Sequence, residues 1–191
     1  MTIGADLLRA ALETVGGLLR DRGFNYELVV IGGGALLLRG VISRPTKDLD
    51  TLAVVRAGTY EVAEPMPGPL LSAIADSAAV HGLDPDWLNN GPWRQLHQGL
   101  PDGFPSRTTM LVFGGLTLHL AGRFDLICLK LYAAADDSPH GKHMHDLVAL
   151  APTSNELDQS ATWVKAQDIA PEFPSFVDAV VAAVEAARGD R

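Results

Sequence analysis

The chain has 191 residues, of which 47% are hydrophobic, and its formal net charge is −8. This length fits one domain, or one domain with a small helical extension, and the apolar fraction can form a sizeable core. No segment approaches roughly eighteen uninterrupted apolar residues, which argues against a membrane span. The acidic balance argues against a protein that coats nucleic acid through bulk electrostatics.

The predicted elements follow from apolar periodicity and from glycine and proline positions. A first helix is predicted from the apolar positions between Leu7 and Leu19, ended by Gly23, and further helices are predicted near 33–39, 70–81, 123–137, 143–151, 154–168 and 174–188. Strands are predicted at 27–31 and 48–55, and as a hairpin within 108–121 that turns at Gly114–Gly115. Loops are predicted at 58–69 and 138–142, and 83–107 is read as irregular with one short helix, anchored by Trp87 and Trp93. This order predicts an α+β fold, in which helices pack on a small mixed α/β sheet and a helical C-terminal part follows.

The N-terminal segment and the cysteine content set the expected compartment. The first twenty residues lack the basic start, apolar centre and cleavage site of a signal peptide. Cys128 is the only cysteine and lies in an apolar segment, so no disulfide framework is expected. We therefore expect a cytoplasmic protein with no membrane association.

Three glycines interrupt the apolar run that begins at Val29, in the stretch VVIGGGALLLRG. A P-loop reading fails because no Lys followed by Ser or Thr ends the turn. A dinucleotide fingerprint also fails, because Leu37 occupies the place of its third glycine. A third interpretation remains, in which the glycines expose the backbone N–H groups of Gly33 and Gly34 at a helix start, so that triphosphate oxygens can approach them closely.

Two aspartates one residue apart, Asp48 and Asp50, open the next predicted strand. Residues i and i+2 of a strand point to the same face, so both carboxylates could hold one or two Mg²⁺ ions. Such ions keep several waters and take phosphate oxygens as their remaining ligands. An Asp-x-Asp pair alone is most often a solvated strand start. A strand, a glycine turn and a helix before such a pair form a much rarer combination, and this combination favours a functional role for the two aspartates.

The whole stretch GGGALLLRGVISRPTKDLD resembles the signature of the polymerase-β-like nucleotidyltransferase superfamily, and more narrowly that of AbiEii-type toxins, including the MenT-like nucleotidyltransferases. A weaker resemblance covers DLICLKLYAAA and KHMHDLVAL. The resemblance implies a nucleotidyltransferase-fold core at 1–136, with a helical region at 137–191 packed on it. It also implies that Lys130 contacts the nucleotide triphosphate and that Asp146 supports the active site. Arg44 and Lys47 are further candidates for contact with phosphate or acceptor.

Lys130 is the only charged residue between Asp125 and Asp136, on an otherwise apolar helix. A buried ammonium needs a partner, so Lys130 should meet a carboxylate or a phosphate, unless its stem reaches water along the edge of the core. Asp146 is placed in the first turn of the following helix, where the helix dipole alone favours an acid. A pairing of Lys130 with Asp146 would suit both readings.

Other candidates are left open. His140, His143 and His145 could bind a transition metal, but histidines facing solvent or RNA phosphates fit the tract better, because no cysteine joins them. Related enzymes often carry a third carboxylate on a later strand, and only His119 and Asp125 stand near that position here. Either two carboxylates suffice, or one of these residues substitutes, or activity is weak or lost.

The expected function is therefore Mg²⁺-dependent transfer of NMP from an NTP to an acceptor. The resemblance implies a toxin of a toxin–antitoxin pair, with the tRNA 3′ end as acceptor and a separate antitoxin protein as partner. Two alternatives remain: transfer to a protein or to a small molecule such as an aminoglycoside, and a catalytically idle module that only binds nucleotide.

Overall fold

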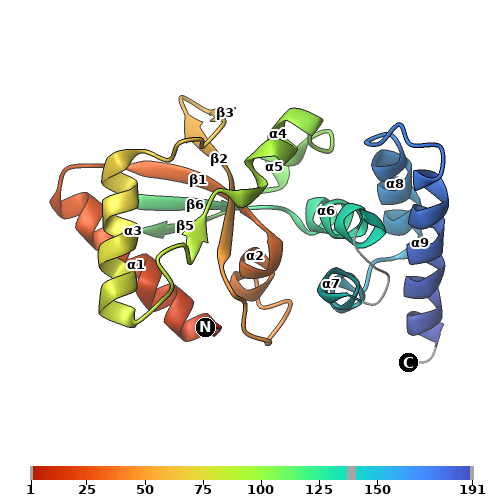
Figure 1. Cartoon of the computed structure of the whole chain (residues 1–191), viewed down its shortest axis with the longest axis horizontal. Helices are drawn as coiled ribbons and strands as arrows, with labels where there is room; N and C mark the ends of the chain where they lie inside the picture. The colour runs from red at the N-terminus through yellow and green to blue at the C-terminus, as the bar shows by residue number, and fades with distance from the viewer. Residues whose placement is uncertain (1, 137–140, 190–191) are drawn as a thin grey trace. The chain divides into compact units, whose positions relative to one another are not determined.

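The computed structural model describes residues 2–136 and 141–189, and its helices and strands are labelled in Figure 1. Contacts divide the chain into two compact units: residues 1–100 with 105–121, and residues 101–104 with 122–191. The long helix after the hairpin therefore groups with the C-terminal helices, whereas the predicted division places it in the core. The predicted domain boundary after residue 136 stays a prediction.

The first unit contains a six-stranded sheet in the order β3-β2-β1-β6-β5, with β4 beside β2. Its strands are β1 Tyr26–Ile31, β2 Leu49–Arg56, β3 Thr59–Glu61, β4 Leu88–Asn89, β5 Thr109–Phe113 and β6 Leu116–Leu120. Strand β1 is antiparallel to β2 and parallel to β6, which confirms the mixed sheet. Its helices are α1 Ala5–Asp21, α2 Gly32–Leu38, α3 Gly68–His81, the 3₁₀ helix η1 Gly91–Arg94 and α4 Gln95–Gln98, and α5 Phe104–Arg107 begins in the other unit.

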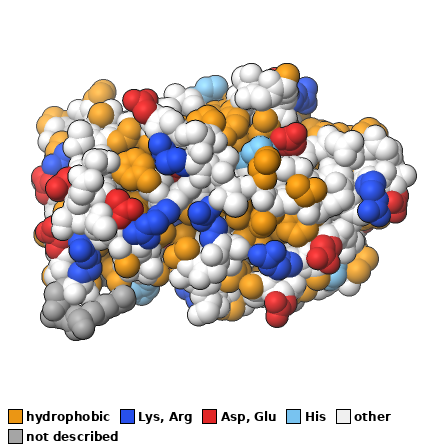
Figure 2. All heavy atoms as spheres, turned by 180° about the vertical axis from the view of Figure 1, so that it is seen from behind, with side chains coloured by type: hydrophobic (Ala, Val, Ile, Leu, Met, Phe, Trp, Pro, Cys, Tyr) orange, Lys and Arg blue, Asp and Glu red, His pale blue; other side chains and the backbone are white. Residues whose placement is uncertain are grey.

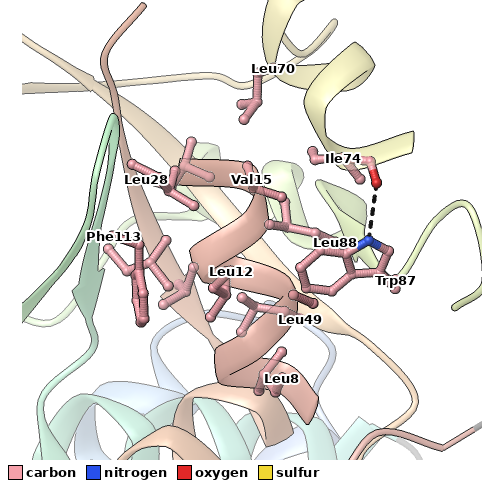
Figure 3. Close-up of a cluster of buried hydrophobic side chains, with 14 of the residues drawn as sticks. Leu8, Leu12, Val15, Leu28, Leu49, Leu70, Ile74, Trp87, Leu88 and Phe113 are labelled. Atoms are coloured by element: carbon pink, nitrogen blue, oxygen red, sulfur yellow. Dashed lines mark hydrogen bonds between the residues drawn. The ribbon is translucent and has the colours of Figure 1, made fainter. Parts of the chain in front are cut away.

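Helices α1 and α3 lie side by side against the sheet, and their apolar residues form its main core (Figure 1). Leu8, Leu12 and Val15 recur at helical spacing on α1 and are fully buried. Trp87 is also fully buried in this cluster, and its Nε1 donates to the carbonyl of Ile74 at 3.3 Å (Figure 3). The predicted anchoring role is confirmed for Trp87, whereas Trp93 is only half-buried.

Two short strands lie where the sequence predicts loop or irregular structure. Strand β3 returns along β2 through a two-residue turn in which Ala57 (φ 48°) and Gly58 (φ 78°) both have positive φ. Such hairpin turns favour Asn or Gly at both positions, so the alanine at position 57 removes part of the sequence pattern that would predict this hairpin. Strand β4 is two residues long and pairs with the start of β2. No local sequence pattern predicts this pairing, because the two segments are far apart in the chain.

The second unit contains α6 Arg123–Asp136, α7 Lys142–Leu150, α8 Ser154–Lys165 and α9 Phe173–Gly189. Helix α6 packs against the other three, and buried leucines and valines fill the contacts between them. Helix α8 begins with a capping box, in which Thr153 Oγ1 accepts from the amide of Glu156 and the Glu156 carboxylate accepts from the amide of Thr153. The predicted helical C-terminal part is confirmed.

The surface mixes residue types. On the face shown in Figure 2, basic side chains lie among acidic and hydrophobic ones. Within residues 2–136 and 141–189, no helix is both long enough and apolar enough to cross a membrane.

Candidate functional site

The carboxylate of Asp50 meets the glycine turn at the end of β1. Ile31, the last residue of β1, is the register partner of Asp50 on β2. Gly32 follows with a φ of 74°, and a Cβ atom at this position would overlap Oδ2 of Asp50. The absence of a side chain at Gly32 therefore makes room for the carboxylate, and Asp50 points toward the glycine turn.

An irregularity in the β1–β2 ladder sets which face Asp50 occupies. Val29 pairs with Ala53, but the next residue, Val30, pairs with Thr51, so Leu52 is the extra residue on β2. A one-residue slip of this kind moves every following side chain to the opposite face of a strand. The shift places Asp50 beside Ile31, where the glycine turn begins.

Asp48 lies immediately before β2, not within the strand as predicted. Asp48 and Asp50 are both half-buried, whereas Leu49 between them is fully buried. Gly34 lies close to this segment, because a Cβ there would lie 2.5 Å from Leu49 Cδ1 and 3.1 Å from the carbonyl of Asp48. Gly34 thus allows α2 to pack against the chain that carries both aspartates, a packing role that the glycine pattern alone did not indicate.

The loop between α2 and β2 carries the predicted basic residues Arg44 and Lys47, and both are exposed. Thr46 anchors this loop: its backbone exchanges two hydrogen bonds with Ile3, and its Oγ1 donates to the carbonyl of Asp48 at 3.1 Å. Arg44 lies near Gly33, with Nη2 3.9 Å from where a Cβ of Gly33 would be. Gly33, Arg44 and Asp48 therefore belong to one local assembly organised by Thr46.

Lys130 and Asp146 form an ion pair within the second unit, with 2.7 Å between Nζ and Oδ2. Their side chains are 7% and 1% exposed, so the predicted pairing is confirmed and the alternative of a lysine reaching water is wrong. The placement of Asp146 in the first turn is also wrong, because α7 begins at Lys142 and Asp146 is its fifth residue. Because both side chains are buried between α6 and α7, each charge needs the other as its countercharge, and the helix dipole is not the reason for the acid at this position.

The two proposed substitutes for a third carboxylate are a paired histidine and a buried aspartate. His119 Nε2 lies 2.7 Å from Glu27 Oε2, and His119 pairs in the ladder with Val29, two residues before the partner of Asp50. The imidazole therefore leans toward Glu27, away from the glycine turn at the other end of β1. Asp125 is completely buried in the first turn of α6.

The residues available for a metal are two carboxylates. Among the described residues, no group of three or more His, Cys, Asp or Glu side chains is placed to hold a metal ion. His145 is exposed, His143 is half-buried, and His140 lies outside the described residues. Two oxygen donors beside an amide-rich turn fit Mg²⁺, which keeps several waters, and do not fit a zinc site.

Two residues that hold this geometry were missing from the predicted site. Gly32 carries the positive φ and the contact with Asp50, although the sequence pattern points only to the two glycines that follow it. Thr46 lies within the Arg-x-Thr-x-Asp-x-Asp stretch, but its role depends on the backbone of Ile3, more than forty positions earlier. The glycine run was a usable signal for Gly32, whereas no local signal existed for Thr46.

The site thus combines a strand, a glycine turn into a helix, and a carboxylate that returns to that turn on a mixed sheet. Residues 8–140 match the model of a family described as nucleotidyltransferase of unknown function (DUF6036), and the chain belongs to this family. No curated protein and no solved structure matches the chain. The matched segment includes Asp48, Asp50 and Lys130, whereas Asp146 lies beyond it.

Proposed function

We propose that this nucleotidyltransferase moves an NMP from an NTP, with Mg²⁺, to the 3′ end of tRNA, as the toxin of a toxin–antitoxin pair. The observation that carries the proposal is the contact of the Asp50 carboxylate with the glycine turn at Gly32. A metal-binding oxygen and a set of helix-start amides then face the same triphosphate.

Asp48 and Asp50 would hold the metal ion. Their two carboxylates leave coordination positions for waters and for phosphate oxygens, as Mg²⁺ requires. When bound, Mg²⁺ would neutralise negative charge on the triphosphate and stabilise the charge on the attacking and the leaving oxygen.

Basic groups and amides would bind the phosphates. The first amides of a helix have no partner within the helix, so those of Gly33 and Gly34 can donate to phosphate oxygens. Arg44 lies beside Gly33 and can add a charged donor, with Lys47 in the same exposed loop. The resemblance also implies that Lys130, whose Nζ is paired with Asp146, contacts the triphosphate.

The reaction is a displacement at the α-phosphorus of the NTP. A hydroxyl oxygen of the acceptor forms the new P–O bond and loses its proton, and the bond to the β-phosphate breaks. Pyrophosphate leaves with the bonding electrons. The chain's own groups orient the triphosphate and stabilise the charge that develops on it.

The acceptor and the partner rest on the resemblance of residues 29–55 to AbiEii-type and MenT-like toxins. A small basic loop on an acidic protein suits one RNA end better than a long duplex, because a long duplex is bound through many phosphate contacts. A separate antitoxin protein would neutralise the activity.

The proposal is tested by incubating the protein with each of the four NTPs labelled at the α-phosphate, with Mg²⁺ and total RNA. Label should appear in RNA of tRNA size, and it should disappear with Asp50→Asn or Asp48→Asn. The matched control is Asp84→Asn, an exposed aspartate of the same unit, which should keep full transfer. Circular dichroism should show all three variants folded.

Other outcomes identify the alternatives. Label in a protein, or in an added aminoglycoside, with none in RNA would replace tRNA as the acceptor. Tight NTP binding without pyrophosphate release under every condition would instead indicate an idle binding module and would contradict the proposal.

A further inference from the structure

We propose that two copies of this chain associate through strand β5, whose outer edge pairs with no strand among residues 2–136 and 141–189 and would pair antiparallel with the same edge of the second copy. Strand β5 is the last strand of the sheet and is hydrogen-bonded to β6 along one side. A free edge of this kind can accept another strand, because its outer N–H and C=O groups point away from the sheet. Such a dimer is independent of the proposed nucleotide transfer.

The exposed side chains of β5 are apolar. Met110 is 63% exposed and Val112 is 68% exposed, and both project to the face of the sheet opposite the main core. Edge strands of monomeric proteins usually carry lysine, proline or bulges that discourage pairing. Within β5 the sequence TMLVF contains none of these, so the edge has the composition of a strand that becomes covered.

The pattern of β5 is complementary to itself. An antiparallel pairing centred on Leu111 places Met110 of each copy opposite Val112 of the other. Each exposed apolar side chain then gains an apolar cross-strand neighbour, and the two contacts are related by a twofold axis. This pairing would join the sheets of the two copies into one continuous sheet.

Helix α1 flanks the same edge. A groove between α1 and the end of β5 is lined by Arg9, Glu13, Gly17 and Arg20 on the helix and by residues 112–114. Gly16 is required by packing, because a Cβ there would overlap the carbonyl of Phe113, but a Cβ at Gly17 would meet nothing within 4 Å. Glycine destabilises a helix interior relative to alanine, and the internal packing of the chain gives no reason for a glycine at Gly17, which leaves this groove open.

The charges on α1 complement each other across such an axis. Arg9 and Glu13 are exposed, carry opposite charges and lie one helical turn apart. A twofold axis perpendicular to both β5 and α1 would make the two α1 helices antiparallel, so that Arg9 of one copy could face Glu13 of the other, twice. Arg9 Nη2 also donates to the carbonyl of Leu38 at 3.3 Å, which holds the side chain at this edge.

The first experiment measures the mass of the full chain by size-exclusion chromatography with light scattering, over a wide range of concentrations. We expect twice the 20.3 kDa of one chain. Met110→Lys and, separately, Val112→Lys should give the monomer mass, and circular dichroism should show both variants folded, since both side chains are exposed in the single chain. The control is Val80→Lys, which changes a 70% exposed valine on α3 and should leave the dimer intact.

The second experiment exchanges the charges on α1. Arg9→Glu and Glu13→Arg should each raise the dissociation constant of the dimer by placing like charges together, and the double variant should restore it. A mass of one chain at every concentration would overturn the proposal. So would a dimer that both lysine variants leave unchanged, or a double charge variant that is weaker than each single one.

Discussion

Lys130 Nζ and Asp146 Oδ2 lie 2.7 Å apart with almost no exposure to solvent, and this pair links α6 to α7. The same unit contains a second lysine–aspartate pair, Lys165 and Asp178, at 2.5 Å with 34% and 63% of the side chains exposed. The two pairs have the same chemistry and differ in burial, so they allow the effect of burial to be measured directly.

We predict that removing one member of the buried pair is strongly destabilising. Lys130→Met should lower the free energy of unfolding by about 3–5 kcal/mol, because Asp146 is left buried without its countercharge. Lys165→Met, the control, should cost at most about 1 kcal/mol. The double variant Lys130→Met with Asp146→Leu should recover much of the loss. Urea unfolding measures all four values, and equal effects at the two lysines would contradict the prediction.

Gly32 should be required for two reasons: its positive φ, and the close approach of the Asp50 carboxylate that a side chain would block. Gly32→Ala introduces a residue at φ 74° and a Cβ that overlaps Asp50 Oδ2, whereas Gly40→Ala introduces one at φ 70° with nothing within 4 Å. The backbone cost of roughly 1–2 kcal/mol is common to both. Only Gly32→Ala should also reduce the rate of NMP transfer, because it displaces the carboxylate. Comparable transfer rates in the two variants would show that the contact is unimportant.

The two tryptophans that follow α3 should differ in their effect on stability. Trp87→Phe removes the indole N–H that donates to the carbonyl of Ile74, which costs about 0.5–1.5 kcal/mol in addition to the packing lost around a fully buried side chain. Trp93→Phe changes a half-buried side chain and should shift the melting temperature much less. Thermal unfolding of both variants, followed by circular dichroism, tests this order.

Glu156 should make stability depend on pH in the acid range. Its burial acts to raise its pKa, but hydrogen bonds from Arg123 and Thr153 outweigh burial and lower the pKa below the ordinary 4.5. A lowered pKa in the folded state contributes stability above the ordinary pKa, and this stability is lost as the pH falls through the folded-state value. The stability difference between wild type and Glu156→Gln should therefore be largest at neutral pH and shrink below about pH 4.5.

Urea unfolding of the two proteins as a function of pH measures this difference. Glu185→Gln on α9 serves as the exposed control, with a small and flat difference expected. A Glu156→Gln difference that grows toward acid pH would contradict a lowered pKa in the folded protein.

Local sequence patterns were sufficient for the long helices and strands and for the position of the glycine turn. The apolar spacing on α1 and the apolar run around Lys130 predict helices because each helical residue packs beside neighbours three and four positions away. The glycine run and the two aspartates mark a turn and an oxygen-donor pair in the same way, since both depend on residues close in sequence.

Tertiary structure alone decided the partners that come from distant positions. The extra residue at Leu52 that sets the face of Asp50 depends on the register with β1, and the anchoring of Thr46 depends on Ile3. His119 lies beside Val29, yet its side chain bonds to Glu27, because β6 pairs with a strand about ninety positions earlier. Register and long-range pairing arise from the packing of whole strands and helices, so no short segment specifies them.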